Sequence, residues 1–292
     1  MKGSWSCLRN EGSVFPAPEK DDDPHLIAFT GHGKRWKAYR KYANSGFSKT
    51  AVLKYHGGQT KDVHVFLQRL LNSPEDFAKQ LNMLVGMIIM RITYGYQVQE
   101  AGDPFVTISD EAIASMSTTG VAGRYLVDSY PFLRFLPGYL AREEMDRVVG
   151  TDRLPTMSDR PKLPYLECIL LETMRWYPVT PLTVPHRVER EDMYQGYRIP
   201  ANSTVFANIY AITRDERIFP NPEAFISERF DGTQPGPTPL DPREFVFGIG
   251  RRICPGNTVA DATIFLVMAN LVATMDITKA KDENGHEIEP KL

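Results

Sequence analysis

The stretch FVFGIGRRICPGN, residues 245–257, combines one cysteine with two arginines and a glycine-rich turn. A long apolar run, residues 262–275, follows it. Pro255 and Gly256 suit the start of a helix, and the free N–H groups at a helix N-terminus stabilise an anion. Together with Arg252, two residues before the cysteine, they favour a thiolate at Cys254.

Several roles are open to such a cysteine. A buried free thiol is the commonest fate of any cysteine. A nucleophile needs a general base, and the histidines nearest in sequence, His186 and His286, lie in no recognisable nucleophile motif, although a base brought close by the fold stays open. The segment GIGRRI is a poor phosphate cradle, because it lacks the third glycine of G-x-G-x-x-G and the lysine of a P-loop. A further role is that of a thiolate axial ligand to haem iron.

The ten residues FGIGRRICPG resemble the haem-ligand loop of the cytochrome P-450 monooxygenases, F-x-x-G-x-R-x-C-x-G. The resemblance implies haem b as cofactor and Cys254 as the proximal iron ligand. It also implies that Phe247 covers the sulfur side and that Arg252 meets a haem propionate. The glycines of the loop would let the backbone approach the porphyrin. The fixed positions are matched at Phe247, Gly250, Arg252, Cys254 and Gly256, and Gly248 is a further glycine within the loop.

A second segment, residues 165–178, places Glu172 three residues before Arg175. Alone, such a pair is more often an exposed ion pair worth a few tenths of a kcal/mol. The surrounding helix is apolar on nearly every side, however, so we expect it to be buried. A buried pair needs further partners, and Arg229 in ISERF is a candidate. In the family an E-x-x-R pair and such an arginine form a triad on the proximal side, although Ser227 stands here where the family usually has proline.

Two more segments resemble the family's propionate-binding arginines. The helix pattern WKAYR matches W-x-x-x-R, which implies that Trp36 and Arg40 reach the haem edge one helical turn apart. Arg187 lies five residues before Asp192, a spacing that resembles the strand bearing another such arginine. We expect the neighbouring His186 to be an ordinary polar residue.

The overall composition and charge limit the kinds of partner that this protein is expected to bind. The 292 residues carry 34 basic and 36 acidic side chains, a formal charge of −2, so no global field attracts nucleic acid. The three cysteines, Cys7, Cys168 and Cys254, lie far apart in the sequence. This spacing argues against a disulfide framework, a zinc knuckle or an iron–sulfur cluster. The N-terminal residues 1–15 have no apolar core of a signal or anchor. The family resides in the endoplasmic reticulum membrane, whereas this chain, without an anchor, is expected to be soluble and cytoplasmic.

The hydrophobic pattern predicts a mainly α fold with a small β-sheet around residues 187–206. The apolar runs 81–90 and 262–275 are shorter than the roughly 20 residues of a membrane span, so we interpret both as buried core helices. Residues 1–24 are irregular, residues 25–141 form an N-terminal helical part, and residues 142–292 form the proximal, haem-thiolate part of one P-450-like domain.

The family's central motif A/G-G-x-D/E-T-T/S is absent from the sequence, so no catalytic residue is identified. The pattern predicts an internal deletion near residues 141–145, and the loss of the anchor, the first strands and the central distal helices. The resemblance implies a truncated, microsomal monooxygenase of fungal type. Such an enzyme inserts one oxygen atom from O2 into a small apolar organic substrate, with electrons from NADPH through a reductase. A non-catalytic haem-binding remnant and a misassembled gene-model fragment are the alternatives.

Overall fold

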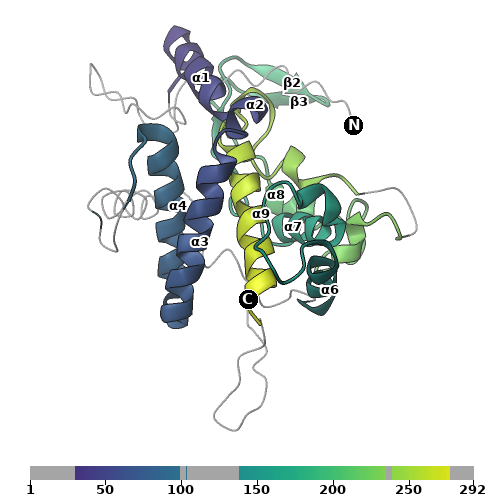
Figure 1. Ribbon diagram of the computed structural model, residues 1–292. Helices are drawn as coiled ribbons and strands as arrows, with labels where there is room; N and C mark the ends of the chain where they lie inside the picture. Colours follow the sequence, from purple (N-terminus) through teal and green to yellow (C-terminus); the bar gives the residue numbers. More distant parts are fainter. Residues whose placement is uncertain (1–29, 99–102, 104–137, 235–238, 277–292) are drawn as a thin grey trace.

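The computed structural model describes residues 30–98, 103, 138–234 and 239–276, so the predicted irregular segment 1–24 lies outside it. Helix α9 (Asn257–Thr274) lies at the centre. Helix α3 (His56–Asn72) contacts one side of it, while α7 (Pro164–Trp176) and α6 (Gly138–Val148) contact the other (Figure 1). Helix α4 (Phe77–Tyr94) packs on the side of α3 that faces away from α9.

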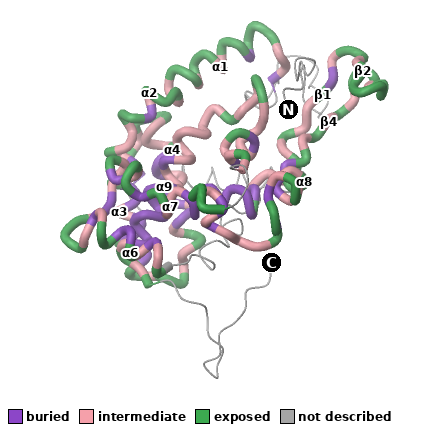
Figure 2. The backbone as a smooth tube through the Cα atoms, turned by 90° about the vertical axis from the view of Figure 1, so that its right-hand side faces the viewer, coloured by how far each residue is buried: buried purple, intermediate pink, exposed green. Residues whose placement is uncertain are grey.

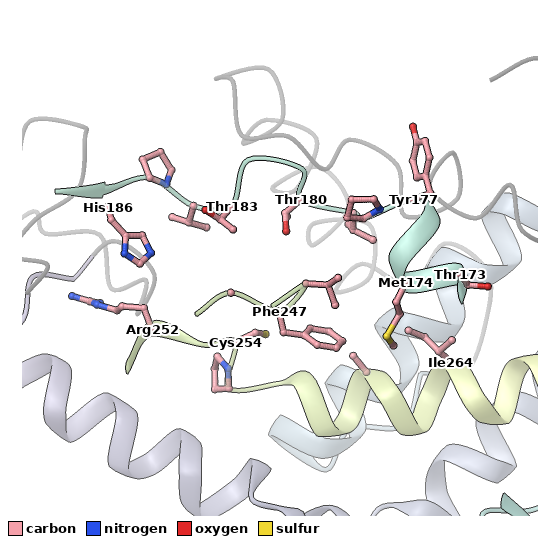
Figure 3. Close-up of a pocket in the computed structure, with 18 of the residues that line it drawn as sticks. Thr173, Met174, Tyr177, Thr180, Thr183, His186, Phe247, Arg252, Cys254 and Ile264 are labelled. Carbon is pink, nitrogen blue, oxygen red and sulfur yellow. The ribbon is translucent and has the colours of Figure 1, made fainter. Parts of the chain in front are cut away.

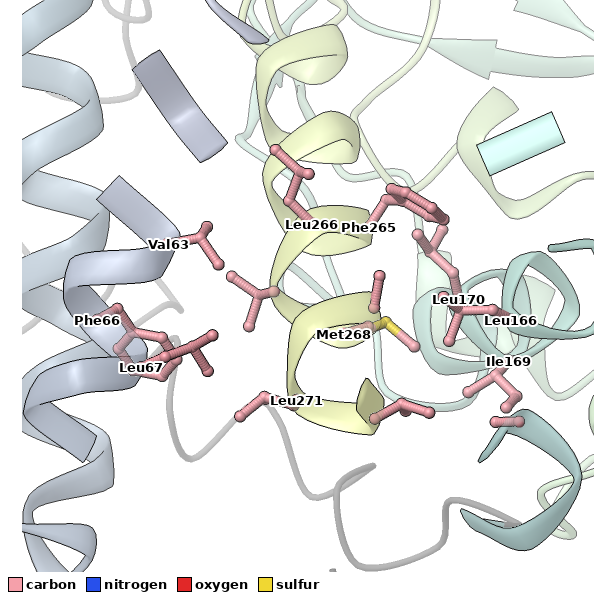
Figure 4. Packing of buried hydrophobic residues seen from close by; sticks show 14 of the residues in the cluster. Val63, Phe66, Leu67, Leu166, Ile169, Leu170, Phe265, Leu266, Met268 and Leu271 are labelled. Atoms are coloured by element: carbon pink, nitrogen blue, oxygen red, sulfur yellow. The ribbon is translucent and has the colours of Figure 1, made fainter. Parts of the chain in front are cut away.

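The hydrophobic core is built around α9, because this helix is apolar on every side and carries one charged residue, Asp261. Each fully buried large aliphatic or aromatic side chain stabilises the fold by about 1.5–3 kcal/mol. Figure 4 shows side chains of α3 and α7 meeting those of α9 from opposite sides. The labelled residues are Val63, Phe66, Leu67, Leu166, Ile169, Leu170, Phe265, Leu266, Met268 and Leu271.

The two apolar runs are core helices, as predicted. Residues 81–90 lie in α4, which buries Leu84 and Ile88, and residues 262–274 lie in α9. By length and composition α9 is also the single helix of the described part that could cross a membrane. Its packing between α3 and α7 makes it the central helix of the core.

The small sheet predicted around residues 187–206 is present as two separate strand pairs. Strand β1 (His186–Arg187) pairs antiparallel with β4 (Thr204–Val205), and β2 (Asp192–Tyr194) pairs antiparallel with β3 (Tyr197–Ile199). Residues 189–191 leave the first ladder before the second begins, which divides the sheet. The fold is therefore mainly helical with two small sheets.

The β2–β3 hairpin closes through a two-residue turn at Gln195 and Gly196, whose φ angles are +50° and +86°. Such a turn needs left-handed backbone at both positions, which glycine adopts without strain. No residue from 192 to 199 is buried, so the hairpin projects from the core (Figure 2).

The predicted join at residues 141–145 lies within α6, which passes through it without a break. Ala141 and Met145 are each 1% exposed. The Glu144 carboxylate accepts hydrogen bonds from the backbone N–H groups of Tyr165 and Leu166, both at 3.0 Å, where α7 begins. These contacts fasten α6 to the N-terminus of α7, which otherwise has no side-chain cap.

One further helix of 14 residues, α1, and several short elements complete the described chain. They are α1 (Lys34–Phe47), α2 (Lys49–Val52), α8 (Ile209–Thr213) and the 3-10 turns η2 (Pro74–Asp76), η4 (Arg160–Lys162), η5 (Ser227–Phe230), η6 (Pro242–Glu244) and η7 (Gly250–Arg252).

Candidate cofactor site

The cysteine loop turns back on itself before α9 begins. Gly248 and Gly250 have φ angles of +87° and +67°, in the left-handed region that glycine adopts readily. The backbone N–H of Cys254 donates to the Phe247 carbonyl at 2.8 Å. A Cβ at Gly256 would lie 3.8 Å from the Cys254 sulfur, so glycine here keeps the space beside the sulfur open. The exposed Cys254 thus stands just before the N-terminus of α9.

A cavity of about 410 Å³ lies against this loop. In Figure 3, Arg252 and His186 lie at one end and Met174 and Ile264 at the other. Cys254 and Phe247 form one wall, and Thr180 and Thr183 lie opposite. The lining residues are Trp36, Arg40, Thr173, Met174, Tyr177, Pro178, Val179, Thr180, Thr183, Val184, Pro185, His186, Val246, Phe247, Gly248, Arg252, Cys254, Pro255, Ala260 and Ile264.

Trp36 and Arg40 of α1 both line this cavity, one helical turn apart. Trp36 is buried, with the His32 ring 5.1 Å from it between centroids and the Arg252 Cζ atom 4.5 Å from its ring centroid. The Arg252 guanidinium also donates to the Thr30 carbonyl at 3.0 Å. The first turn of α1 therefore holds the arginine of the cysteine loop.

Among the described residues, the lining at the polar end of the cavity carries Arg40 and Arg252 and no acidic side chain, although the nearby Glu189 acts to raise the pKa of Arg252. Burial lowers the pKa of Arg252, and the nearby Arg40 lowers it further. Burial likewise lowers the pKa of Arg40. A ligand with carboxylates at this end would relieve the repulsion between the two guanidinium groups.

The resemblance implied that Arg187 meets a propionate and gave His186 no role, but His186 rather than Arg187 lies in the lining of the cavity. The Arg187 guanidinium bonds the Asn202 Oδ1 atom at 2.6 and 3.1 Å, and Arg187 does not line the cavity. His186 does line it, and burial together with Arg252 lowers the pKa of its ring. Neighbouring residues of a strand point to opposite faces. The spacing in the sequence indicated Arg187, but spacing alone does not determine which of two neighbouring strand residues faces inward.

The three charged residues expected to form a triad lie together behind the cavity. Glu172 and Arg175 are 0% exposed and Arg229 is 5% exposed. The Glu172 carboxylate accepts two hydrogen bonds from Arg175 at 2.7 Å, and Arg229 Nε lies 3.3 Å from Glu172 Oε2. The remaining donors of the two arginines bond backbone carbonyls, including those of Thr213 and Asn221. Buried charges are tolerated when every donor is satisfied in this way.

The residues present fit haem b. Cys254 lies in the lining with its thiol exposed, and a cysteine thiolate is one of the side chains that bind haem iron. Haem has an apolar ring and two propionates on one edge, and the cavity has an apolar end and a cationic end. Cys254, Phe247 and Gly248 line the wall between these ends.

Comparison with known proteins identifies the family of this chain. The family model for cytochrome P450 matches residues 140–292. The cytochrome P450 monooxygenase claT of Ampulloclitocybe clavipes is 30% identical over 359 residues, covering 91% of this chain and 72% of the relative. Cytochrome P450 monooxygenase 176 of Postia placenta is 29% identical and is covered to 70%. The chain belongs to the cytochrome P450 family.

A solved structure supports the fold. A zebra fish cytochrome P450 in a structure with abiraterone matches with a TM-score of 0.67 at 22% identity, over 86% of this chain and 76% of that one. The chain is shorter than its relatives. The 359 aligned positions of claT hold 91% of the 292 residues here, or about 266, so about 93 of those positions have no counterpart in this chain.

Proposed function

We propose that this chain binds haem b, with the Cys254 thiolate as axial ligand, as the proximal part of a monooxygenase. The observation that carries the proposal is one cavity whose lining contains Cys254, an apolar end near Met174 and Ile264, and a cationic end at Arg40 and Arg252. Arg40, Arg252 and His186 would hold the propionates. A thiolate-ligated haem supplies the activation of O2 that family members use.

The test is the absorbance spectrum of the reduced, carbon monoxide-bound protein after haem is supplied. We expect a thiolate-type spectrum that Cys254→Ala abolishes. Cys168→Ala is the matched control, because Cys168 is buried in α7, where burial raises its pKa to about 11, and it does not line the cavity. A thiolate-type spectrum that survives in the Cys254 variant would contradict the ligand assignment.

The substrate we propose is a small apolar organic molecule, with electrons from NADPH through a reductase. The lining near Thr180 supports an apolar substrate, since Val179, Val184 and Pro185 lie beside it. These residues contribute to a lining that offers the ligand van der Waals contact rather than charge. Oxidation of such a substrate would also need a proton source beside the substrate and a site that keeps out bulk water.

A haem-binding protein without productive turnover is the second candidate. The observation behind it is the absence of the motif A/G-G-x-D/E-T-T/S from the sequence, together with about 93 aligned positions of a relative that have no counterpart here. Product formed per NADPH consumed, measured with a reductase, separates the two candidates. Tight coupling supports the monooxygenase, and NADPH consumption with little product supports the second candidate.

A further inference from the structure

Five charged side chains meet beside the cysteine loop, outside the cavity. We call this group the clamp; it comprises Arg160, Glu167, Asp241, Arg243 and Asp261. Arg243 Nη1 donates to Glu167 Oε1 at 2.7 Å and lies 3.6 Å from Asp261 Oδ1. Arg160 bonds the same two carboxylates, at 2.9 Å to Glu167 and 2.6 Å to Asp261. Asp241 holds Arg243 from its own turn, with its carboxylate accepting from Arg243 Nη2 at 2.6 Å.

The clamp joins parts of the chain that are distant in sequence. Arg160 and Asp261 are 101 residues apart, and Glu167 and Arg243 are 76 residues apart. The side chains are 16–35% exposed, so water screens them only in part. Bidentate arginine–carboxylate pairs of this kind fix geometry as well as adding stability.

Two residues of the clamp lie on either side of the cysteine loop in the sequence. Arg243 lies before the cysteine loop, in η6, and Asp261 lies after it, in the second turn of α9. Their contact brings together the two ends of the segment 244–260, which contains Cys254 two residues after its midpoint. A segment closed at both ends loses conformational freedom, so the residues within it, Cys254 included, are held more narrowly in place.

We propose that Arg243 is a positioning residue for Cys254, acting through the clamp rather than by touching the cofactor. This inference deepens the proposed function, because the loop concerned is the one that would hold the iron. Arg243 does not line the cavity, so its effect on ligation must pass through the backbone of the loop. The hydrogen bond from Cys254 N–H to the Phe247 carbonyl, at 2.8 Å, reports the state of that backbone.

The first measurement is amide hydrogen exchange of the haem-free protein, comparing wild type with Arg243→Gln. We expect exchange at Cys254 to become about tenfold faster, because the lost charge-assisted bonds are among the stronger ones in proteins. Exchange at the core helix α3 should keep its wild-type rate. Equal acceleration in the loop and in α3 would mean that Arg243 only stabilises the fold, and unchanged exchange at Cys254 would equally overturn the proposal.

Two further variants test whether the expected change at Cys254 is specific to the clamp. Asp261→Asn removes the charge from the other end of the clamp and should speed exchange at the same amide. Arg217→Gln is the matched control, since Asp215 and Arg217 repeat the Asp-x-Arg pattern of Asp241 and Arg243. The Arg217 side chain is 85% exposed, and its ion pair runs to Asp215 of its own turn. We expect no change at Cys254 in this variant, and an effect equal to that of Arg243→Gln would contradict the role of the clamp.

The second measurement uses the haem-loaded protein. Arg243→Gln should lower the fraction of reduced, carbon monoxide-bound haem that shows thiolate ligation, and Arg243→Lys, which keeps the charge, should restore part of it. A thiolate fraction equal to wild type in Arg243→Gln would overturn the positioning role. If wild type binds no haem, the proposed function fails, whereas the exchange experiment still decides whether the clamp positions Cys254.

Discussion

The Arg252 guanidinium lies over the Trp36 ring, 4.5 Å from its centroid, so the cysteine loop is held from α1 by a cation–π contact. The two residues are 216 positions apart in sequence. Arg40, one turn after Trp36, repels Arg252. The tryptophan ring and the Thr30 carbonyl therefore both hold a cation that its like-charged neighbour repels.

Replacing Trp36 should weaken haem binding. We expect Trp36→Ala to reduce affinity about tenfold, because a partly desolvated cation–π contact is worth about 1–2 kcal/mol. Trp36→Phe keeps an aromatic ring beneath Arg252 and should lose less. Titration of each protein with haem, followed by absorbance, gives the affinities. An equal loss in both variants would indicate that the indole N–H matters rather than the ring face.

Removing Glu172 should destabilise the fold strongly. Glu172→Ala leaves Arg175 and Arg229 buried without their shared carboxylate, and we expect a cost of about 3–5 kcal/mol in the free energy of unfolding. The control is Glu223→Ala, since Glu223 also pairs with an arginine, Arg214, but is 73% exposed. Urea unfolding of both variants makes the comparison. A loss of only a few tenths of a kcal/mol in each would mean that the triad contributes little.

Glu144 should matter for docking α6 onto α7. Its carboxylate accepts the N–H groups of Tyr165 and Leu166, so Glu144→Ala removes the cap of α7 and should cost about 1–2 kcal/mol. Glu143 is adjacent but exposed, and Glu143→Ala should change stability by less than about 0.5 kcal/mol. Unfolding in urea gives both values. Similar losses in the two variants would contradict a capping role.

His186 should make stability depend on pH. Burial and the nearby Arg252 lower its pKa below the ordinary value of 6.5. At mildly acid pH the unfolded chain therefore binds a proton that the folded protein does not. The contribution of His186 is fully present above its unfolded pKa and declines as the pH falls below it.

The measurement is urea unfolding of wild type and His186→Gln in haem-free form, from about pH 8 to about pH 5. The free-energy difference between the two proteins should be constant above the unfolded pKa of His186 and should shift in favour of the variant below it. A difference that stays constant over the whole range would show that His186 does not titrate in this way.

The sequence predicted those parts of the site that depend on short, residue-specific motifs. The cysteine loop needs glycine at positions of positive φ, so Gly248 and Gly250 can be recognised as part of the motif from the sequence alone. The spacing of Glu172 and Arg175 on an apolar helix likewise indicated a buried pair, and the structure brings Arg229 to it. The helical runs follow from hydrophobic periodicity, which is a local property.

The features that the sequence did not predict depend on tertiary contacts. The spacing to Asp192 indicated Arg187 at a propionate, but His186 lines the cavity, because neighbouring strand side chains alternate and a spacing does not fix which of two polar residues faces inward. The division of one expected sheet into two pairs follows from where the chain leaves the ladder after Val188. The clamp around Arg243 joins residues too far apart for any spacing rule to connect.

The β2–β3 hairpin has a practical consequence for laboratory work. Its turn at Gln195 and Gly196 stands clear of the core, and none of the residues 192–199 is buried. Exposed turns of this kind accept inserted peptides with little effect on folding. The tip of the hairpin is therefore a suitable attachment point for an affinity tag or a fluorescent label.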